Sequence, residues 1–113
     1  MVDSETAELS IVILNYNVKN LLLNCLESVF QSKGKLDRWQ VIVVDNASSD
    51  GSVEAVKEKY GSPSTSLRVD LIENKLNLGF AAGNNLGVKK AKAPVILFLN
   101  PDTIIMYHAI QKT

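Results

Sequence analysis

Short apolar runs alternate along the 113-residue chain with longer segments in which apolar residues recur at helical spacing. The runs that predict strands are residues 9–15, 40–45, 67–72 and 95–99. Between them, three segments place apolar side chains three and four positions apart, which predicts one apolar face per helix. These segments are residues 18–31, the stretch from Asp50 to Tyr60, and residues 79–92.

Strands that alternate with helices favour parallel pairing through right-handed crossovers. We therefore expect an α/β domain, half of a Rossmann-like three-layer sandwich, with a mostly parallel four-stranded sheet. The alternating run 67–72 is the weakest strand and is expected at an edge, whereas the run VILFL at 95–99 is expected to be the most buried. The polar, acidic residues 1–8 predict a flexible N-terminus, residues 9–113 a single domain, and residues 104–112 the start of one more helix.

Three glycines recur at every fourth position of the third predicted helix: Gly79, Gly83 and Gly87. An interior glycine costs a helix roughly 1 kcal/mol relative to alanine, so close packing against the sheet is the expected compensation. Asn85 shares a helical face with Ala81 and Val88, which predicts that it is buried and hydrogen-bonded.

Polar residues follow three of the predicted strands: Asn15-Tyr16-Asn17, Asp45-Asn46 and Asn100-Pro101-Asp102. The carboxyl ends of parallel strands meet at one edge of a sheet, where ligands of such folds bind. An aromatic ring stacks on a planar base, one carboxylate accepts hydrogen bonds from a base or ribose, and another binds Mg²⁺ or Mn²⁺ on a diphosphate. Together these groups suit a nucleotide sugar. Tyr16 could equally cover the end of the sheet, and Asp45 or Asp102 could cap a helix; Asp50 is expected to be the N-cap of the second helix.

Several classes of protein are disfavoured. Twelve basic and twelve acidic residues give no net charge, unlike most nucleic-acid-binding domains. Neither G-x-G-x-x-G nor G-x-x-x-x-G-K-[ST] is present, and the single histidine, His108, gives no zinc cluster or Ser-His-Asp set. No apolar run has the length of a transmembrane segment, and the single cysteine, Cys25, fits a reducing compartment.

Four segments resemble the successive signatures of family 2 glycosyltransferases of the GT-A fold: SIVILNYN (10–17), VIVVDNASSDGS (41–52), NLGFAAGNNLGVKKA (77–91) and ILFLNPDT (96–103). The resemblance runs from Leu9 to about Thr103, in the family's order and spacing. The N-P-D-T segment is similar to that of bacterial rhamnosyl- and galactofuranosyl-transferases.

The resemblance implies a UDP- or dTDP-sugar donor and a Mg²⁺ or Mn²⁺ ion. Tyr16 would stack on the base, Asp45 would contact it, and Asp102 would bind the metal as the last aspartate of D-x-D. The donor-binding residues implied are Asn15, Tyr16, Asn17, Asp45, Asn77, Gly79, Asn85 and Asn100. Asn100 stands where many members have the first aspartate of D-x-D, which weakens the metal site.

The family inverts the anomeric carbon by direct attack of an acceptor hydroxyl, which needs a general base. No position of this chain matches that base, so we expect the donor-binding part without catalysis by these residues alone. The alternative is a non-catalytic fragment or pseudoenzyme that binds nucleotide or a partner chain. The resemblance further implies a cytoplasmic role at the inner face of the membrane, in cell-envelope polysaccharide synthesis. Self-association through exposed apolar surface is also expected.

Overall fold

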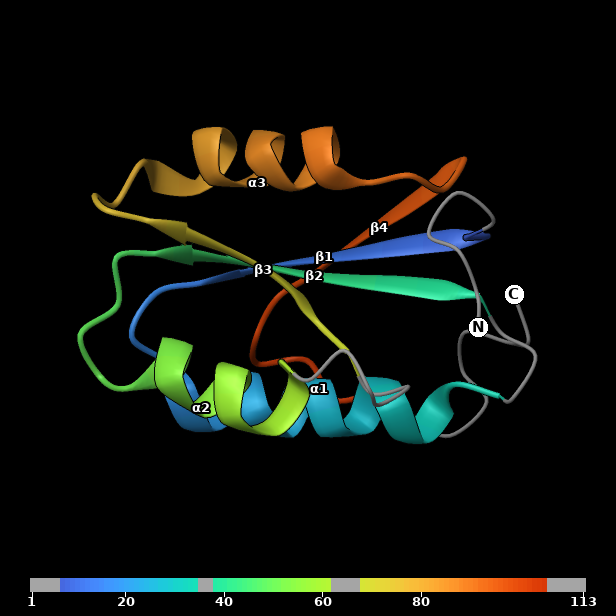
Figure 1. The fold of residues 1–113 in the computed structure, drawn as a ribbon, viewed down its shortest axis with the longest axis horizontal. Coiled ribbons are helices and arrows are strands. Elements are labelled where there is room, and N and C mark those ends of the chain that lie inside the picture. The colour runs from blue at the N-terminus through green and yellow to red at the C-terminus, as the bar shows by residue number, and fades with distance from the viewer. Residues whose placement is uncertain (1–6, 35–37, 62–67, 106–113) are drawn as a thin grey trace.

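A computed structural model describes residues 7–34, 38–61 and 68–105 and shows an α/β sandwich of three layers (Figure 1). Its parallel four-stranded sheet has the order β3-β2-β1-β4. The strands are β1 (Leu9–Asn15), β2 (Trp39–Asn46), β3 (Asp70–Asn74) and β4 (Val95–Leu99). Helices α1 (Lys19–Ser32) and α2 (Ser52–Tyr60) cover one face and α3 (Gly79–Lys90) covers the other. The predicted fold class is therefore confirmed.

The strand register brings the polar strand ends to one edge of the sheet. β1 pairs with β2 from Leu9–Trp39 to Asn15–Asp45, and Ile13 of β1 lies opposite Leu99 of β4. The loops that leave β1, β2 and β3 lie together at the left of Figure 1. We call this edge the rim; it comprises residues 15–19, 45–51, 74–79 and 100–103.

The two faces of the sheet carry cores of different size. Alternate residues of the strands, such as Ile11 and Val43, pack with Leu26 and Val56 under α1 and α2 in the larger core. The intervening residues, represented by Val12, form a smaller core beneath α3. Continuous apolar strands are expected where both faces of a parallel sheet are covered, and β1 and β2 satisfy that condition.

Close packing of α3 explains two of its glycines. A Cβ atom on Gly87 would lie 2.4 Å from Val12 Cγ1, and one on Gly83 would lie 2.5 Å from Leu14 Cδ1. The prediction of close helix–sheet packing is confirmed for these two residues. Gly79 differs, because its φ of +84° requires a left-handed backbone while nothing lies within 4 Å of its missing Cβ.

The prediction that Asn85 is buried was wrong. Asn85, Ala81 and Val88 are all exposed. Consecutive helical residues are rotated by roughly 100°, so side chains two positions apart point in nearly opposite directions. Since Gly83 and Gly87 face the sheet, Asn85 lies between them on the outer face of α3.

β4 was expected to be the most buried strand and is instead an edge. Val95 is 57% exposed and Phe98 is 49% exposed, because α3 contacts β1 and β2 and β4 has one neighbouring strand. The third strand lies at the other edge, as predicted, but runs over Asp70–Asn74 rather than 67–72. Self-association through the exposed apolar residues stays a prediction, and the expected helix from residue 104 falls mainly outside the described residues.

A buried polar network lies at the end of the sheet opposite the rim. Gln40 Oε1 accepts hydrogen bonds from Ser10 Oγ at 2.7 Å and from the backbone nitrogen of Lys92 at 2.9 Å. Gln40 Nε2 donates to Asp70 Oδ2 at 3.0 Å, and the nitrogen of Ala93 donates to Ser10 Oγ at 3.2 Å. The network joins three strands to the turn between α3 and β4.

The described residues include the last two of the N-terminal segment that was expected to be flexible. Ala7 is buried, and the backbone nitrogen of Glu8 donates to the carbonyl oxygen of Arg38 at 2.7 Å; residues 1–6 lie outside the description. In the three described ranges, no helix has both the length and the apolarity to cross a membrane.

Candidate functional site

Asp45 is buried in the rim, and both of its carboxylate oxygens accept hydrogen bonds. Its Oδ1 atom accepts hydrogen bonds from Asn15 Nδ2 at 2.8 Å and from Ser48 Oγ at 2.7 Å. Its Oδ2 atom accepts one from the backbone nitrogen of Ser48 at 2.9 Å. Because Asp45 is only 2% exposed, a bound molecule reaches its oxygens only if Ser48 moves. The hypothesis that Asp45 contacts the base directly stays a prediction.

Ser48 joins the loop after β2 to the loop after β1. Its Oγ atom accepts hydrogen bonds from the backbone nitrogen of Asn17 at 2.9 Å and from Asn15 Nδ2 at 3.2 Å. Asn17, whose φ is +51°, accepts one at its Oδ1 atom from the nitrogen of Ser49 at 2.7 Å. Tyr16, between the two asparagines, remains 50% exposed. The bonded backbone around it leaves the ring directed outward.

Asp50 was expected to be the N-cap of α2, but the cap position is Gly51, with a φ of +87°. Asp50 instead bonds the starts of two helices. Its Oδ2 atom accepts from the nitrogen of Lys19 in α1 at 2.9 Å, and its Oδ1 atom from the nitrogen of Ser52 in α2 at 3.0 Å and from Ser52 Oγ. Burial raises the pKa of Asp50, but the hydrogen bonds from Ser52 and Lys19 outweigh it, and the net pKa is below the ordinary value. We call Asn15, Asn17, Asp45, Ser48 and Asp50 the β1–β2 clasp.

Asn46 holds the start of α3 and was not among the predicted site residues. It is buried, its Nδ2 atom donates to the carbonyl oxygen of Gly79 at 3.1 Å, and its Oδ1 atom accepts from Asn74 Nδ2 at 2.8 Å. Asn77 Oδ1 accepts from the nitrogen of Gly79 at 2.9 Å. Asn77 and Gly79 are both exposed on the rim, and their contact with a nucleoside stays a prediction. The place of Asn46 directly after Asp45 at a strand end is the signal that could have revealed it.

The turn after β4 carries Asn100 and Asp102, both exposed. It closes through a hydrogen bond from the nitrogen of Thr103 to the carbonyl oxygen of Asn100 at 2.9 Å. Cys25 of α1 lies beneath it, with Sγ 3.8 Å from the same oxygen. Burial raises the pKa of the Cys25 thiol to about 11, and the negative charge of Asp102 adds to this rise. The turn that carries Asp102 is thus attached to α1 through Cys25.

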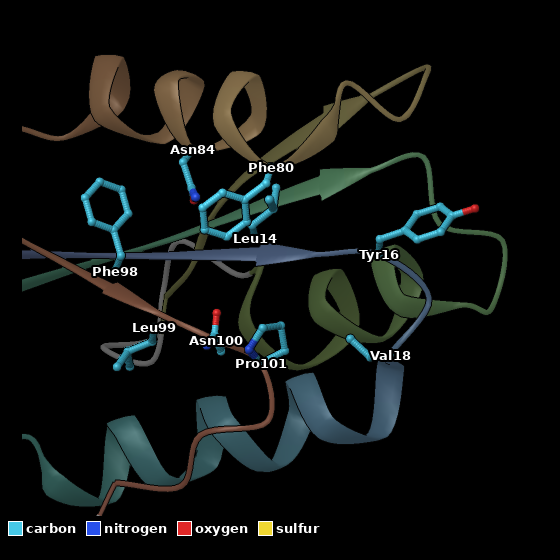
Figure 2. Close-up of a pocket in the computed structure, with 9 residues that line it drawn as sticks. All are labelled: Leu14, Tyr16, Val18, Phe80, Asn84, Phe98, Leu99, Asn100 and Pro101. Atoms are coloured by element: carbon cyan, nitrogen blue, oxygen red, sulfur yellow. The ribbon is translucent and has the colours of Figure 1, made fainter.

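A hollow of about 250 Å³ opens between α3, β1 and β4. Figure 2 shows its side chains coming from α3, from β1 and the loop after it, and from β4 and the turn after it. They are Leu14, Tyr16, Val18, Phe80, Asn84, Phe98, Leu99, Asn100 and Pro101. Two of the predicted residues, Tyr16 and Asn100, line it. Asn15 and Asp45 are buried within the rim, Asn17 and Asp102 are exposed on it, and Asn85 lies on the outer face of α3.

The rim offers few oxygen ligands for a metal ion. Among the described residues, no three His, Cys, Asp or Glu side chains gather in a way that could hold one. Asp102 provides one exposed carboxylate, and Asn100 an exposed amide. Mg²⁺ in nucleotide sites is commonly bound by one or two carboxylates together with phosphate oxygens. The residues present therefore fit an ion shared with a bound diphosphate.

The parallel α/β sandwich, with an outward aromatic ring, a partly apolar hollow and an exposed carboxylate on one rim, places the chain in the Rossmann-like class of folds, whose ligands bind at the carboxyl ends of the strands. The family model described as "Glycosyl transferase family 2" matches residues 10–113, so the chain belongs to this family.

Curated relatives agree with this assignment. An uncharacterized glycosyltransferase of Haemophilus influenzae is 33% identical over 104 residues, which cover 92% of this chain and 32% of that protein. The poly(ribitol-phosphate) beta-glucosyltransferase of Bacillus spizizenii is 33% identical over 107 residues, covering 91% of this chain and 16% of that protein. The chain thus spans less than half the length of either relative.

Solved structures show the same fold. A mannosyltransferase from Pyrobaculum calidifontis, in complex with GDP-Man and Mn²⁺, matches with a TM-score of 0.77 and 24% identity over 88% of this chain and 29% of that one. S. aureus TarS 1-349 in complex with UDP-GlcNAc matches with a TM-score of 0.81 and 22% identity over 93% of this chain and 29% of that one. At such identities these likenesses establish the GT-A fold.

Proposed function

We propose that this chain is the part of an inverting glycosyltransferase that binds the nucleotide-diphospho-sugar donor. The observation that carries the proposal is the common position of Tyr16, the hollow beside it, and Asp102 on one rim. A half-exposed ring offers a stacking surface for a base, and the wall of the hollow is mostly apolar with two amides, Asn84 and Asn100. The exposed Asp102 carboxylate lies on the β4 side, where the diphosphate would extend.

The clasp would serve the nucleoside end of the donor. Ser48, which is bonded to Asn15 and Asp45, holds the backbone nitrogen of Asn17 next to Tyr16, so that the Tyr16 ring is placed before a ligand arrives. Such preorganisation lowers the entropic cost of binding. In this proposal, Asp45 hydrogen-bonds to the base directly only if Ser48 first rotates away from the carboxylate.

Asp102 would hold a divalent cation on the diphosphate, with Asn100 beside it. When bound, such an ion neutralises the negative charge that develops on the departing diphosphate. The Mn²⁺ in the mannosyltransferase complex supports this role. Because one carboxylate is a weak site by itself, we expect the cation to bind together with the diphosphate.

The donor and the pathway are proposed as classes and not as single compounds. The UDP and UDP-GlcNAc in complexes of the neighbour TarS favour a uridine donor, with dTDP-sugars as the related alternative. The relatives that act on poly(ribitol-phosphate) or polymerise poly(glycerol phosphate) support a role in cell-envelope polymers, with the protein in the cytoplasm at the inner membrane face. The rhamnosyltransferase-like subtype rests on Asn100-Pro101-Asp102-Thr103 alone.

Calorimetry with UDP, in the presence of Mn²⁺ and of a chelator, tests the proposal. Asp45→Ala should weaken UDP binding under both conditions, because the clasp supports the nucleoside. Asp102→Ala should remove the part of the affinity that depends on Mn²⁺ and leave the remainder. No detectable UDP binding by the wild-type chain at millimolar concentration would argue against a donor site in these residues.

Sugar transfer needs a general base in addition to a bound donor. No residue of this chain matches the family's base, so we expect donor binding without multiple-turnover transfer. Incubation with UDP-GlcNAc and candidate acceptors, followed by mass spectrometry, measures transfer directly. Turnover that is lost in Asp102→Ala would place the base within these residues.

A further inference from the structure

The turn that carries Asp102 is attached to α1 on both sides. Before Asp102, the carbonyl oxygen of Asn100 lies 3.8 Å from Cys25 Sγ. After it, the backbone nitrogen of Ile105 donates a hydrogen bond to Ser28 Oγ at 3.0 Å. Cys25 and Ser28 are three positions apart, so they lie on one face of the helix. Both are buried, at 0% and 6% exposure.

Ser28 makes the stronger of the two attachments. Its hydroxyl donates to the carbonyl oxygen of Cys25 at 2.7 Å, which leaves oxygen lone pairs to accept the Ile105 N–H. Alanine at position 28 would favour the helix more and would suit its apolar face equally well. It would, however, remove the hydrogen-bond partner of the partly buried Ile105 N–H, and leaving such a group unpaired is costly.

The Asp102 side chain has no comparable support of its own. Within residues 7–34, 38–61 and 68–105, its carboxylate makes no side-chain hydrogen bond or ion pair. Its position therefore follows from the backbone of the turn. That backbone is held by its own Thr103–Asn100 hydrogen bond and by the two attachments to α1.

We infer that Ser28, assisted by Cys25, is a positioning residue that holds the Asn100–Ile105 segment so that Asp102 meets a cation carried by the donor diphosphate. This inference rests on the proposed donor-binding function. Ser28 acts through the backbone of Ile105 and touches neither cation nor nucleotide. The nucleoside end of the site, at the clasp, is independent of this attachment.

The test compares UDP affinity with Mn²⁺ and with a chelator in wild type, Ser28→Ala, Ser28→Thr and Cys25→Ala. We expect Ser28→Ala to reduce the Mn²⁺-dependent gain in affinity about fivefold, as for the loss of one hydrogen bond of ordinary net strength. Affinity in the chelator should not change. Ser28→Thr, which keeps the hydroxyl, should restore most of the gain, and Cys25→Ala should have a smaller effect than Ser28→Ala.

Ser10→Ala is the matched control. Ser10 Oγ also donates to one group and accepts from a distant backbone nitrogen, that of Ala93, but at the opposite end of the sheet. Ser10→Ala keeps the bonds of Gln40 to the carbonyl oxygen of Lys90 and from the backbone nitrogen of Lys92, which hold β4 in register. It should therefore leave the Mn²⁺-dependent gain in UDP affinity unchanged. Amide hydrogen exchange at Ile105 gives a readout without ligand: Ser28→Ala should speed it, and Ser10→Ala should not.

The outcomes separate the inference from the function on which it rests. If the Mn²⁺-dependent gain in UDP affinity is lost in Asp102→Ala but retained in full in Ser28→Ala, the inference is overturned. The proposal that the chain binds the donor is not affected by that result. Unchanged exchange at Ile105 in Ser28→Ala also overturns it. A wild-type chain that binds UDP without any gain from Mn²⁺ overturns the proposed metal role and the inference together.

Discussion

The two ends of the rim are built differently. At the β1–β2 clasp, side chains bond to one another and to neighbouring backbone, and Asp45 is 2% exposed. At the turn after β4, Asn100 and Asp102 are exposed, and the turn is attached to α1 through Cys25 and Ser28. Asp45 lies at the end of β2 and Asp102 lies just beyond the end of β4, yet the first carboxylate is hydrogen-bonded within the protein and the second is available.

This difference indicates how one rim serves two chemistries. A base is flat and uncharged, so a rigid surface of fixed shape recognises it well. A cation on a diphosphate needs carboxylate oxygen that is not already bonded to the protein. We therefore expect mutations at the clasp to change stability, and mutations at the turn to change binding that depends on metal.

Removal of the Asp45 carboxylate should have the largest effect on stability. Asp45→Ala deprives Asn15 Nδ2 and the Ser48 N–H of buried acceptors, which predicts a loss of about 3 kcal/mol in the free energy of unfolding. Urea denaturation measures it. A loss below about 0.5 kcal/mol, the range of ordinary surface substitutions, would show that the clasp is not the rigid part of the rim.

Asp50→Ala should cost about 1 kcal/mol, as for the loss of a helix cap, since Asp50 serves the first N–H groups of both α1 and α2. The effect should depend on pH. Because the folded pKa is lowered, the carboxylate contributes its full stability above its ordinary value of 3.8 and loses it as the pH falls through the lowered pKa. Denaturation of wild type and variant at pH 7 and pH 3 should give a smaller difference at pH 3.

Ala47→Gly should stabilise the chain slightly. Ala47 has a φ of +64°, and the left-handed region costs an L-residue roughly 1–2 kcal/mol. The greater freedom of glycine in the unfolded chain offsets part of this, which leaves a gain of about 0.5 kcal/mol. The control is Ala55→Gly in the middle of α2, where the same change should cost about 1 kcal/mol. Equal losses in the two variants would contradict the strain at Ala47.

Asp102→Ala should have the smallest effect on stability, within about 0.5 kcal/mol, because the side chain is exposed and the turn is held by backbone groups. Thermal denaturation in a chelator provides the measurement. Marked destabilisation of Asp102→Ala in the chelator would mean that side chains at both ends of the rim contribute to stability.

The sequence predicted the arrangement of elements better than their burial. The apolar run of β4 resembles that of a central strand, because a short apolar run does not reveal how many neighbours a strand has. Its edge position follows from pairing with β1 alone. Likewise, Asn85 and the glycines two positions away from it cannot all face the sheet. The close contacts of Gly83 and Gly87 with β1 show that the glycine face packs inward.

The sequence predicted where the candidate-site residues lie, but not which hydrogen bonds they make. Parallel strands bring Tyr16, Asp45 and Asp102 to one edge by topology alone. The bond between Asn15 and Asp45 follows from their pairing in the β1–β2 register. The bonds of Ser48 to Asp45 and from the nitrogen of Asn17 join the two loops, each of which contains a left-handed residue, Asn17 in one and Ala47 in the other. Residues other than glycine adopt such conformations rarely, so the sequence gives little warning of them.

The polar network around Gln40 determines how far β4 extends toward the rim. β4 has a single partner strand, and a slip of one residue along β1 would move Asp102 by about 3.3 Å and exchange the two faces of the strand. Such a slip would break the bonds of Ser10 to Ala93 and of Gln40 to Lys92, at the opposite end of the sheet. Gln40 thus fixes the register of β4 on β1. Its replacement by leucine would allow misaligned β4 strands, in which the Asp102 carboxylate lies out of reach of the donor.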